Sequence, residues 1–447
     1  MNRVRIPIAI QLLAAVLSVG AVAGDKMVLT LDDSLRLALK QNPFYLAAKA
    51  QEDQASAAVG QAVAGFFPSV NAQGSNVLDK KVFSIEFPSM IPGEPPQRFK
   101  IDFTRAYQFT VNFSLPVFTG GRLVSGYKTA NFNLEATREA IRQSRQETVL
   151  NVKRAFYGYL LARSFVDVAG EGVTLAEKHF TNVKNLAEVG MASKFDLLRS
   201  EVQLANLKPQ LIRARNGLSM AELGLKTLLG LDLGQEVEFK GELTFQAVEV
   251  NVDADVAQAL INRPELNQLK YRRLMASEAV KMNMGAYLPT VAIGGAYNYW
   301  ANTFNFSKNN WESFYQVNLV LNIPIFNGFL NSAKVGESRA QLRQLEYSQK
   351  GLIESVKFEV QEAVLALRQA RESLLSQEKN VEQAREAVRI AELNYTEGLA
   401  TNLDVSSAQV ALSQAKTNQA QALYDYAVAL AQLERSVGAG QDRYEDK

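Results

Sequence analysis

The side chains that usually carry chemistry are scarce in this chain. It has 447 residues, no cysteine and a single histidine, His179, which we expect at a solvated helix position. The lack of cysteine excludes disulfides, thiolate metal sites and cysteine nucleophiles, and one histidine makes histidine-rich metal sites and Ser-His-Asp relays hard to build. No glycine-rich phosphate loop follows a strand pattern, and no carboxylate pair stands apart from helix-surface charge. We therefore expect no enzyme, no cofactor and no metal site.

Two acidic residues follow glycines at matching positions. Asp196 lies six residues after Gly190, and Asp404 lies six residues after Gly398. Each aspartate closes a Ser/Thr-x-x-Asp pattern, which is typical of a capping box at the start of a helix. The pattern by itself predicts that both carboxylates cap helices.

The sequence contains two copies of one unit. Three intervals recur with equal length. Pro43 to Pro68 equals Pro264 to Pro289, and Pro116 to Gly190 equals Pro324 to Gly398. Gly190 to Gly230 likewise equals Gly398 to Gly438. Equal intervals of this kind indicate a tandem duplication, with a first repeat over residues 24–245 and a second over residues 246–447. One interval is 13 residues longer in the first copy, which predicts an extra exposed loop between Val77 and Lys100.

Each copy contains a pair of predicted strands, at about residues 68–115 and 289–323. Apolar residues occupy every second position over residues 101–115, with the single exception of Arg105. The second copy repeats this alternation over residues 315–323. The alternation and the length suit strands that cross a bilayer.

A long helical hairpin is predicted after each strand pair, at about residues 117–230 and 325–437. From Val360 to Tyr395 apolar or small residues recur in steps of three and four, which indicates a coiled-coil seam. A helix of 74 residues would extend about 110 Å. The expected fold is mainly α, with rods too long for an ordinary globular domain.

The N-terminus has the features of a secretory signal. Arg3 and Arg5 precede an apolar run over residues 6–19, and a small-x-small pattern ends at Ala23. These features predict a signal peptide over residues 1–23, with an uncleaved membrane anchor as the alternative. The formal net charge is only +2, which argues against a nucleic-acid surface held by bulk charge.

Two strand pairs give too few strands for a spanning barrel. An open four-stranded sheet leaves unpaired edges that lipid cannot satisfy, and known spanning barrels begin at about eight strands. Either the sheet is outside a membrane, or chains pool their strands; three chains would supply twelve. Trp300 and Trp311 flank the loop between the two predicted strands of the second copy. They are consistent with an interfacial aromatic belt, with ordinary loop packing as the alternative.

The sequence resembles the TolC family of outer-membrane efflux proteins over nearly the whole mature chain. The resemblance rests on the duplication and on two motifs that occur once in each copy. Pro-x-Phe-x-Gly occurs at Pro116–Gly120 and at Pro324–Gly328. Gly-x-x-x-x-x-Asp occurs at Gly190–Asp196 and at Gly398–Asp404. It implies a homotrimer in outer-membrane lipid, with a transmembrane twelve-stranded β-barrel and an α-helical barrel in the periplasm. It also implies a passive channel that joins a periplasmic adaptor protein and an inner-membrane pump, in efflux or type I secretion. A non-conducting coiled-coil surface or adhesin protein is the alternative.

The resemblance further implies a gate at the ends of the helical hairpins. In the family, acidic residues near the pore axis constrict the closed channel at this gate. Asp196, Asp404 and Tyr395 match positions of the gate. Ala400 stands where some members have a gating arginine and Ser407 where they have a second aspartate, so we expect a less acidic constriction. The turns themselves would contact the adaptor, and the candidate contact residues are Gly190, Met191, Gly398 and Leu399. Helix capping alone is the other interpretation of both aspartates.

Overall fold

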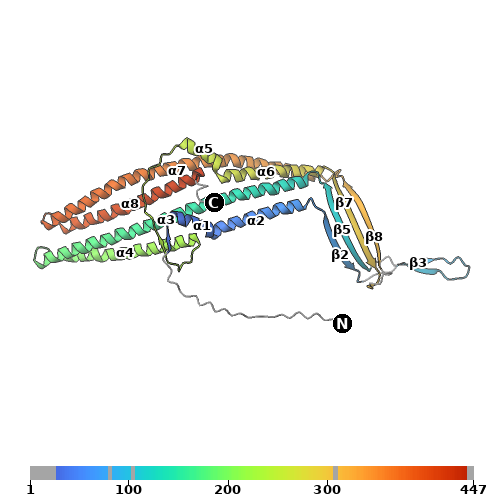
Figure 1. Cartoon of the computed structure of the whole chain (residues 1–447), viewed down its shortest axis with the longest axis horizontal. Coiled ribbons are helices and arrows are strands. Elements are labelled where there is room, and N and C mark those ends of the chain that lie inside the picture. Colours follow the sequence, from blue (N-terminus) through green and yellow to red (C-terminus); the bar gives the residue numbers. More distant parts are fainter. Residues whose placement is uncertain (1–26, 79–82, 102–105, 306–310, 440–447) are drawn as a thin grey trace, which may run out of the picture.

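The computed structural model describes residues 27–78, 83–101, 106–305 and 311–439. The predicted signal peptide at residues 1–23 lies outside these ranges. The helices are α1 (Leu31–Gln41), α2 (Pro43–Ala64), α3 (Arg122–Glu188), α4 (Lys194–Leu229), α5 (Val252–Asn262), α6 (Pro264–Met284), α7 (Leu330–Thr396) and α8 (Asn402–Val437), with a 3-10 turn at Gly285–Tyr287. The strands are β1 (Met27–Leu29), β2 (Ser69–Asn76), β3 (Phe83–Phe87), β4 (Gln97–Ile101), β5 (Tyr107–Phe118), β6 (Val237–Phe239), β7 (Thr290–Ala301) and β8 (Glu312–Asn322). Helical hairpins occupy one end of a long molecule and the main sheet lies toward the other (Figure 1).

Corresponding helices of the two halves have equal lengths, except that α2 has 22 residues and α6 has 21. α1 and α5 have 11 residues each, α3 and α7 have 67, and α4 and α8 have 36. Pro43 and Pro264 begin α2 and α6, where a missing N–H is one of the unpaired donors of a helix start. Gly230 and Gly438 end α4 and α8 with φ of 71° and 72°, a left-handed conformation that glycine adopts without strain. The repeated prolines and glycines thus set the same helix boundaries twice.

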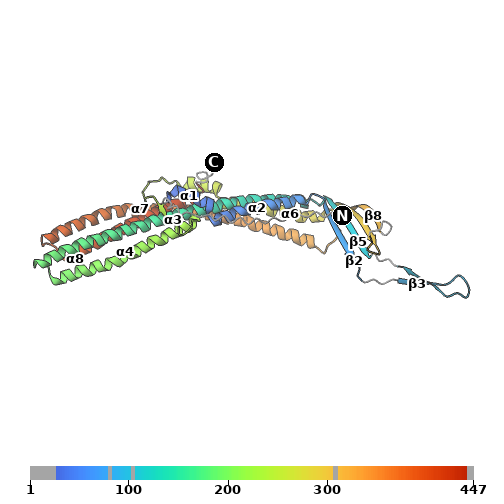
Figure 2. The ribbon, with the colours of Figure 1, turned by 60° about the horizontal axis from the view of Figure 1, so that its bottom comes forward.

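The long helices pack side by side through apolar seams. α3 packs against α4, α7 against α8, and α3 also against α8, which gives the order α4, α3, α8, α7. Both hairpins end at the same end of the molecule in two views (Figures 1 and 2). The buried residues of the α7 seam include Val360, Ala363, Leu367, Ala370, Leu374, Val381 and Val388. These are positions that the spacing of three and four predicted, and 67 residues extend about 100 Å.

A buried ion-pair network joins the second half near the base of its hairpin. The Arg263 side chain is 3% exposed and lies 2.6 Å from Glu359 and 3.1 Å from Glu265. Arg435 of α8 lies 3.2 Å from the same Glu265. Burial alone would raise the pKa of Glu265, but hydrogen bonds from Arg263 and the positive charges of both arginines outweigh it and the pKa is lowered. The position equivalent to Arg263 in the first half is Asn42, whose amide donates to the Leu228 carbonyl at 2.8 Å.

The main sheet has four antiparallel strands in the order β2-β5-β7-β8. Every neighbouring pair is antiparallel, so strand direction alternates across the sheet. Within the described part of the chain, β2 and β8 each have a strand partner on one side only. The two edges of the sheet are therefore open.

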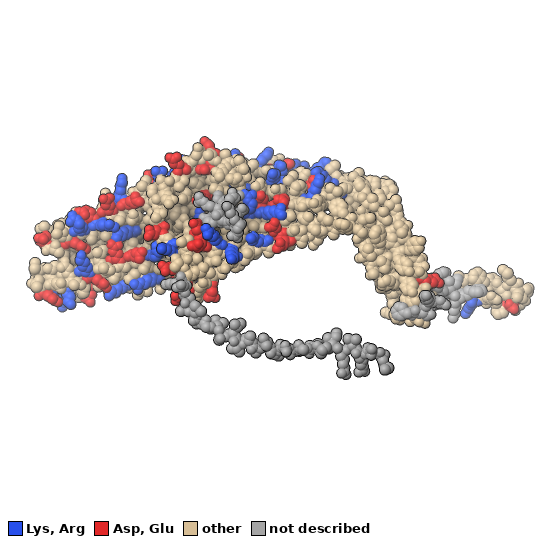
Figure 3. All heavy atoms as spheres, viewed as in Figure 1, with Lys and Arg blue, Asp and Glu red and all other residues tan. Residues whose placement is uncertain are grey.

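The two faces of this sheet differ in polarity. Strand register places Val111 beside Tyr297, and Tyr297 beside Tyr315, on an apolar face. On the opposite face the Thr110 hydroxyl donates to the Asn298 amide oxygen at 3.0 Å. The four strands contain one charged residue, Glu312, and the sheet shows almost no charge (Figure 3).

The strand predicted over residues 101–115 is wrong at both ends. β5 runs from Tyr107 to Phe118, whereas Ile101 ends β4, a strand of a separate hairpin with β3. Arg105, which broke the alternation, lies outside the described residues between these two strands. The extra segment of the first copy therefore contains a β-hairpin, because residues 83–87 and 97–101 alternate well enough to pair with each other.

Candidate functional site at the helical tips

The two turns at the ends of the helical hairpins, residues 189–193 and 397–401, are called here the first tip and the second tip. Gly190 and Gly398 have φ of 80° and 71°. The N–H of Met191 bonds to the Leu186 carbonyl at 2.7 Å, and the glycine N–H bonds to the next carbonyl, which is the Schellman pattern of a helix end. The second tip repeats both bonds. Local sequence therefore fixes both tips in the same conformation.

Both tips expose apolar side chains. Met191 is 74% exposed and Leu399 is 79% exposed. A Schellman turn usually buries the residue at this position against its own helix. Each tip therefore presents an apolar side chain to solvent.

The second tip has the full capping box that the sequence pattern predicts, whereas at the first tip Ser193 caps α4 and the Asp196 carboxylate bonds to the Ser193 hydroxyl. Ser193 and Asp196 exchange bonds at the start of α4, with the Ser193 hydroxyl 2.6 Å from the carboxylate and the Asp196 N–H 3.1 Å from the hydroxyl oxygen. At the second tip the Thr401 hydroxyl and N–H donate to the Asp404 carboxylate at 2.7 and 2.8 Å. Those two bonds hold the pKa of the exposed Asp404 below its ordinary value.

Of the three predicted gate residues, the structure brings together two. The phenol of Tyr395 on α7 has a raised pKa because it is partly buried and because the Asp196 charge lies nearby. Asp404 is exposed, and its hydrogen bonds run to Thr401 of its own tip. Capping by Asp404 and proximity of Asp196 to Tyr395 are thus separate features of the site.

A buried polar chain links the two hairpins behind the tips. The Asn402 amide donates to the Asp196 backbone carbonyl at 2.8 Å, so its oxygen faces the ring of His179. His179 Nε2 lies 2.8 Å from that oxygen and must be the donor, since an amide oxygen only accepts. The imidazole also meets the Tyr395 ring edge to face at 5.3 Å. His179, Asn402 and the Asp196 carbonyl are called here the tip lock.

The expectation that His179 is solvated is wrong, since it is 6% exposed. Ala176 and Val183 of the buried α3 seam lie three residues before and four residues after it. That spacing was a readable signal for a buried histidine. Asn402, which is 3% exposed, carried no such signal because it begins a helix.

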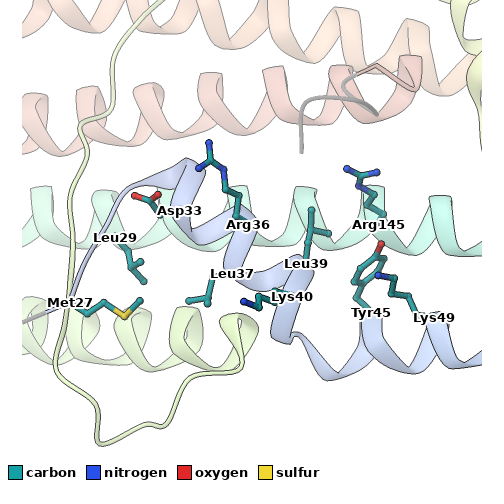
Figure 4. A pocket seen from close by; sticks show the side chains of 10 residues that line it. All are labelled: Met27, Leu29, Asp33, Arg36, Leu37, Leu39, Lys40, Tyr45, Lys49 and Arg145. Carbon is teal, nitrogen blue, oxygen red and sulfur yellow. The ribbon is translucent and has the colours of Figure 1, made fainter. Parts of the chain in front are cut away.

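Two concave surfaces lie along the helices. One, of about 460 Å³, lies between α3 and α7 at the tips and is lined by Lys178, His179, Thr181, Asn182, Asn185, Glu392, Tyr395 and Thr396. The other, of about 610 Å³, surrounds α1 and combines apolar side chains with four cations, Arg36, Lys40, Lys49 and Arg145 (Figure 4). Among the described residues no group of three or more His, Asp or Glu side chains is placed to hold a metal ion. Within the same residues no helix is long and apolar enough to span a bilayer.

The fold and the tips together define a class of protein. A nearly uncharged sheet with one apolar face lies at one end, and paired helical hairpins with exposed tips lie at the other. A sheet of this polarity suits lipid and the charged hairpins suit water, as expected of an outer-membrane protein.

The chain belongs to the outer membrane efflux protein family, whose sequence pattern matches residues 34–231 and 256–439. It is 21% identical over 416 residues to the outer membrane protein TolC of Vibrio cholerae, covering 90% of this chain and 89% of that one. It is 24% identical over 335 residues to the alkaline protease secretion protein AprF of Pseudomonas aeruginosa, covering 73% and 69%. The crystal structure of CusC superimposes with a TM-score of 0.75 at 18% identity, covering 92% of each chain. The predicted family, fold class and outer-membrane location are thereby confirmed.

Proposed function

We propose that three copies of the chain form one passive outer-membrane channel, with a shared twelve-stranded β-barrel and a periplasmic helical barrel. The channel receives cargo from an inner-membrane pump through a periplasmic adaptor protein and has no catalytic activity. The open edges of the sheet are the observation that supports the trimer. An unpaired strand edge in lipid leaves backbone groups unsatisfied, at several kcal/mol each.

Strand direction supports closure of such a barrel. Because direction alternates from β2 to β8, the β8 edge of one copy meets the β2 edge of the next in antiparallel fashion. The apolar face would then contact lipid, and the face with Thr110 and Asn298 would line the lumen. β5, β7 and β8 have 11 or 12 residues, enough for tilted strands to cross the bilayer.

The tips are proposed as the gate. Asp196 and Tyr395 lie near one another on different hairpins, so any separation of the hairpins changes their environment. Asp404 is proposed to add charge to the constriction while it caps α8, because its carboxylate is exposed and ionised. Where Ala400 takes the place of an arginine, the tip lock links the two hairpins, and a bond from the Ser406 hydroxyl to Gln203 joins α8 to α4 one turn further on.

The tip turns are proposed as the contact with the adaptor. Gly190 and Gly398 hold the turns, and Met191 and Leu399 present the exposed apolar side chains. Polar substitution of Met191 and Leu399 together should weaken adaptor binding without changing conductance. Equal affinity of the double variant and the wild type would remove these residues from the interface.

The mass of the detergent-solubilised protein, from light scattering with the detergent subtracted, tests the trimer. Conductance of the same protein in planar bilayers tests the channel. The competing function is a non-conducting coiled-coil surface or adhesin protein, whose rods are spacers. A trimer without conductance under any condition would favour that function, and a monomer in detergent would overturn the shared barrel.

A further inference from the structure

The β3–β4 hairpin of the first copy has two unlike faces. Its register places Phe99 opposite Ile85 and Arg98 opposite Glu86. Because alternate residues of a strand share a face, Ile85 and Phe87 fall on one side of the ribbon and Glu86 on the other. Arg98 and Glu86 form an ion pair on their side. The ribbon is therefore apolar on one face and polar on the other.

The apolar face and the turn of this hairpin lie open. Ile85 is 43% exposed, and in the turn Ile91 is 59% exposed and Met90 is fully exposed. No described helix or strand other than β3 and β4 themselves packs extensively on the ribbon. A lone two-stranded hairpin is marginally stable in water. The exposed side chains of Ile85, Met90 and Ile91 are available to an apolar surface outside the chain.

Two aromatic pairs lie where β5 begins and where β7 ends. Tyr299 and Trp311 stack at 4.7 Å, and Tyr107 meets Phe304 at 5.3 Å, all at the end of the sheet remote from the helices. Tyr and Trp in such positions mark the level of the lipid headgroups. The hairpin leaves the sheet between β2 and β5 at this same end (Figure 1). Along the chain, β3 and β4 therefore fall between the two strand ends nearest these aromatic side chains.

The turn combines apolar residues and prolines with one charged residue, Glu94, which accepts a bond from the Ser89 hydroxyl, and this mixture suits the headgroup region. Four prolines, Pro88, Pro92, Pro95 and Pro96, fall between the two strands of the hairpin. Proline has no N–H, so each one removes a donor that lipid would leave unsatisfied. The second copy joins β7 and β8 without a comparable insertion, so the fold itself does not require the hairpin.

We propose that the β3–β4 hairpin lies on the outer leaflet of the outer membrane. Its apolar face and the turn at Met90 and Ile91 enter the headgroup region, and the face with Glu86 and Arg98 points to water. The partner is the lipid surface itself. This inference rests on the outer-membrane location of the chain and on neither the trimer nor transport.

Single cysteines test the position of the hairpin because the chain has none of its own. Met90→Cys reports on the turn, and Ser84→Cys is the matched control on the polar face. Each full-length variant is labelled with a polarity-sensitive fluorophore and reconstituted in phosphatidylcholine bilayers, with or without brominated acyl chains. The label at 90 should shift its emission to shorter wavelength and be quenched by bromine in the lipid. The label at 84 should be quenched by iodide in the water and little by the lipid.

Two results would overturn the proposal. One is equal quenching of both labels by aqueous iodide, which would place the turn in water. The other is protection of the label at 90 from both quenchers, together with a disulfide between copies of unlabelled Met90→Cys under oxidising conditions, which would show that hairpins cover one another. Ile91→Cys repeats the measurement at a neighbouring position. Conductance recorded from the same preparations keeps a failure of this inference apart from a failure of the proposed channel.

Discussion

Replacement of Asn402 by alanine tests whether opening of the tips must break the tip lock. The substitution removes both bonds of the Asn402 amide, one from His179 and one to the Asp196 carbonyl, each 2.8 Å long. α8 keeps its capping box, since Thr401 and Asp404 are unchanged. The variant therefore loosens the contact between hairpins and leaves the helix start intact.

The magnitude follows from burial. Asn402 is 3% exposed and His179 is 6% exposed, so the variant leaves a buried ring N–H without its acceptor. Such an orphaned donor costs about 1–3 kcal/mol. Because the tip borders water that can partly replace the lost bonds, we expect about 2 kcal/mol, which is roughly 30-fold in the equilibrium between joined and separated hairpins.

Single-channel recording in planar bilayers measures the effect. Asn402→Ala should raise the fraction of time spent in the high-conductance state, up to that factor. Asn418→Ala is the matched control, because Asn418 lies on the same helix and accepts its bond from Gln414 within α8. The control should behave as the wild type.

A variant that melts at a lower temperature yet opens as seldom as the wild type would refute the reasoning. The tip lock would then hold the fold without being broken in opening. Equal gains in Asn402→Ala and Asn418→Ala would refute it as well, since only the first removes bonds between hairpins.

Four further outcomes are expected. Arg263→Ala leaves the buried Glu265 without its nearest partner and should lower the free energy of unfolding by about 3 kcal/mol in thermal unfolding. Lys357→Ala, which breaks the exposed ion pair with Glu354, is the control and should change it little. The folded-state pKa of Glu265 is lowered, so the ionised carboxylate stabilises the fold at neutral pH, and this stabilisation is lost as pH falls below the ordinary value of 4.5. The loss of unfolding free energy in Glu265→Gln, relative to the wild type, should therefore shrink over the same pH range. Gly398→Val forces a β-branched residue to φ of 71° and should cost about 1–2 kcal/mol and weaken adaptor binding. Asp404→Asn keeps much of the cap but removes charge, so it should change ion selectivity if the residue lines the constriction; unchanged selectivity and conductance would leave Asp404 as a cap only.

Local signals in the sequence were sufficient for the helices and for both tips. Proline at a helix start, glycine at a helix end and Ser/Thr-x-x-Asp act within a few residues, so Pro43, Gly398 and Asp404 have the local roles that their types predict. The β3–β4 hairpin was missed because the alternation of β4 was merged with that of β5 into one predicted strand.

Long-range partners could not be predicted in the same way. His179 and Asn402 are 223 residues apart in the chain, and neither sequence neighbourhood names the other. Their contact depends on how α3 packs against α8. Residues with a local role could thus be assigned from the sequence, whereas residues whose role is to join the two halves could not.

The pairing of β5 with β7 also dictates an order of events during biosynthesis. Thr110 and Asn298, which meet across this pair, are 188 residues apart, so the centre of the sheet cannot form until most of the chain has been made. The helical hairpins depend on contacts closer in the sequence and are expected to form sooner. Until β7 arrives, β2 and β5 form a hairpin with one apolar face and two open edges, a species prone to aggregation. The first copy is therefore the part of the chain whose apolar sheet edge stays unpaired longest.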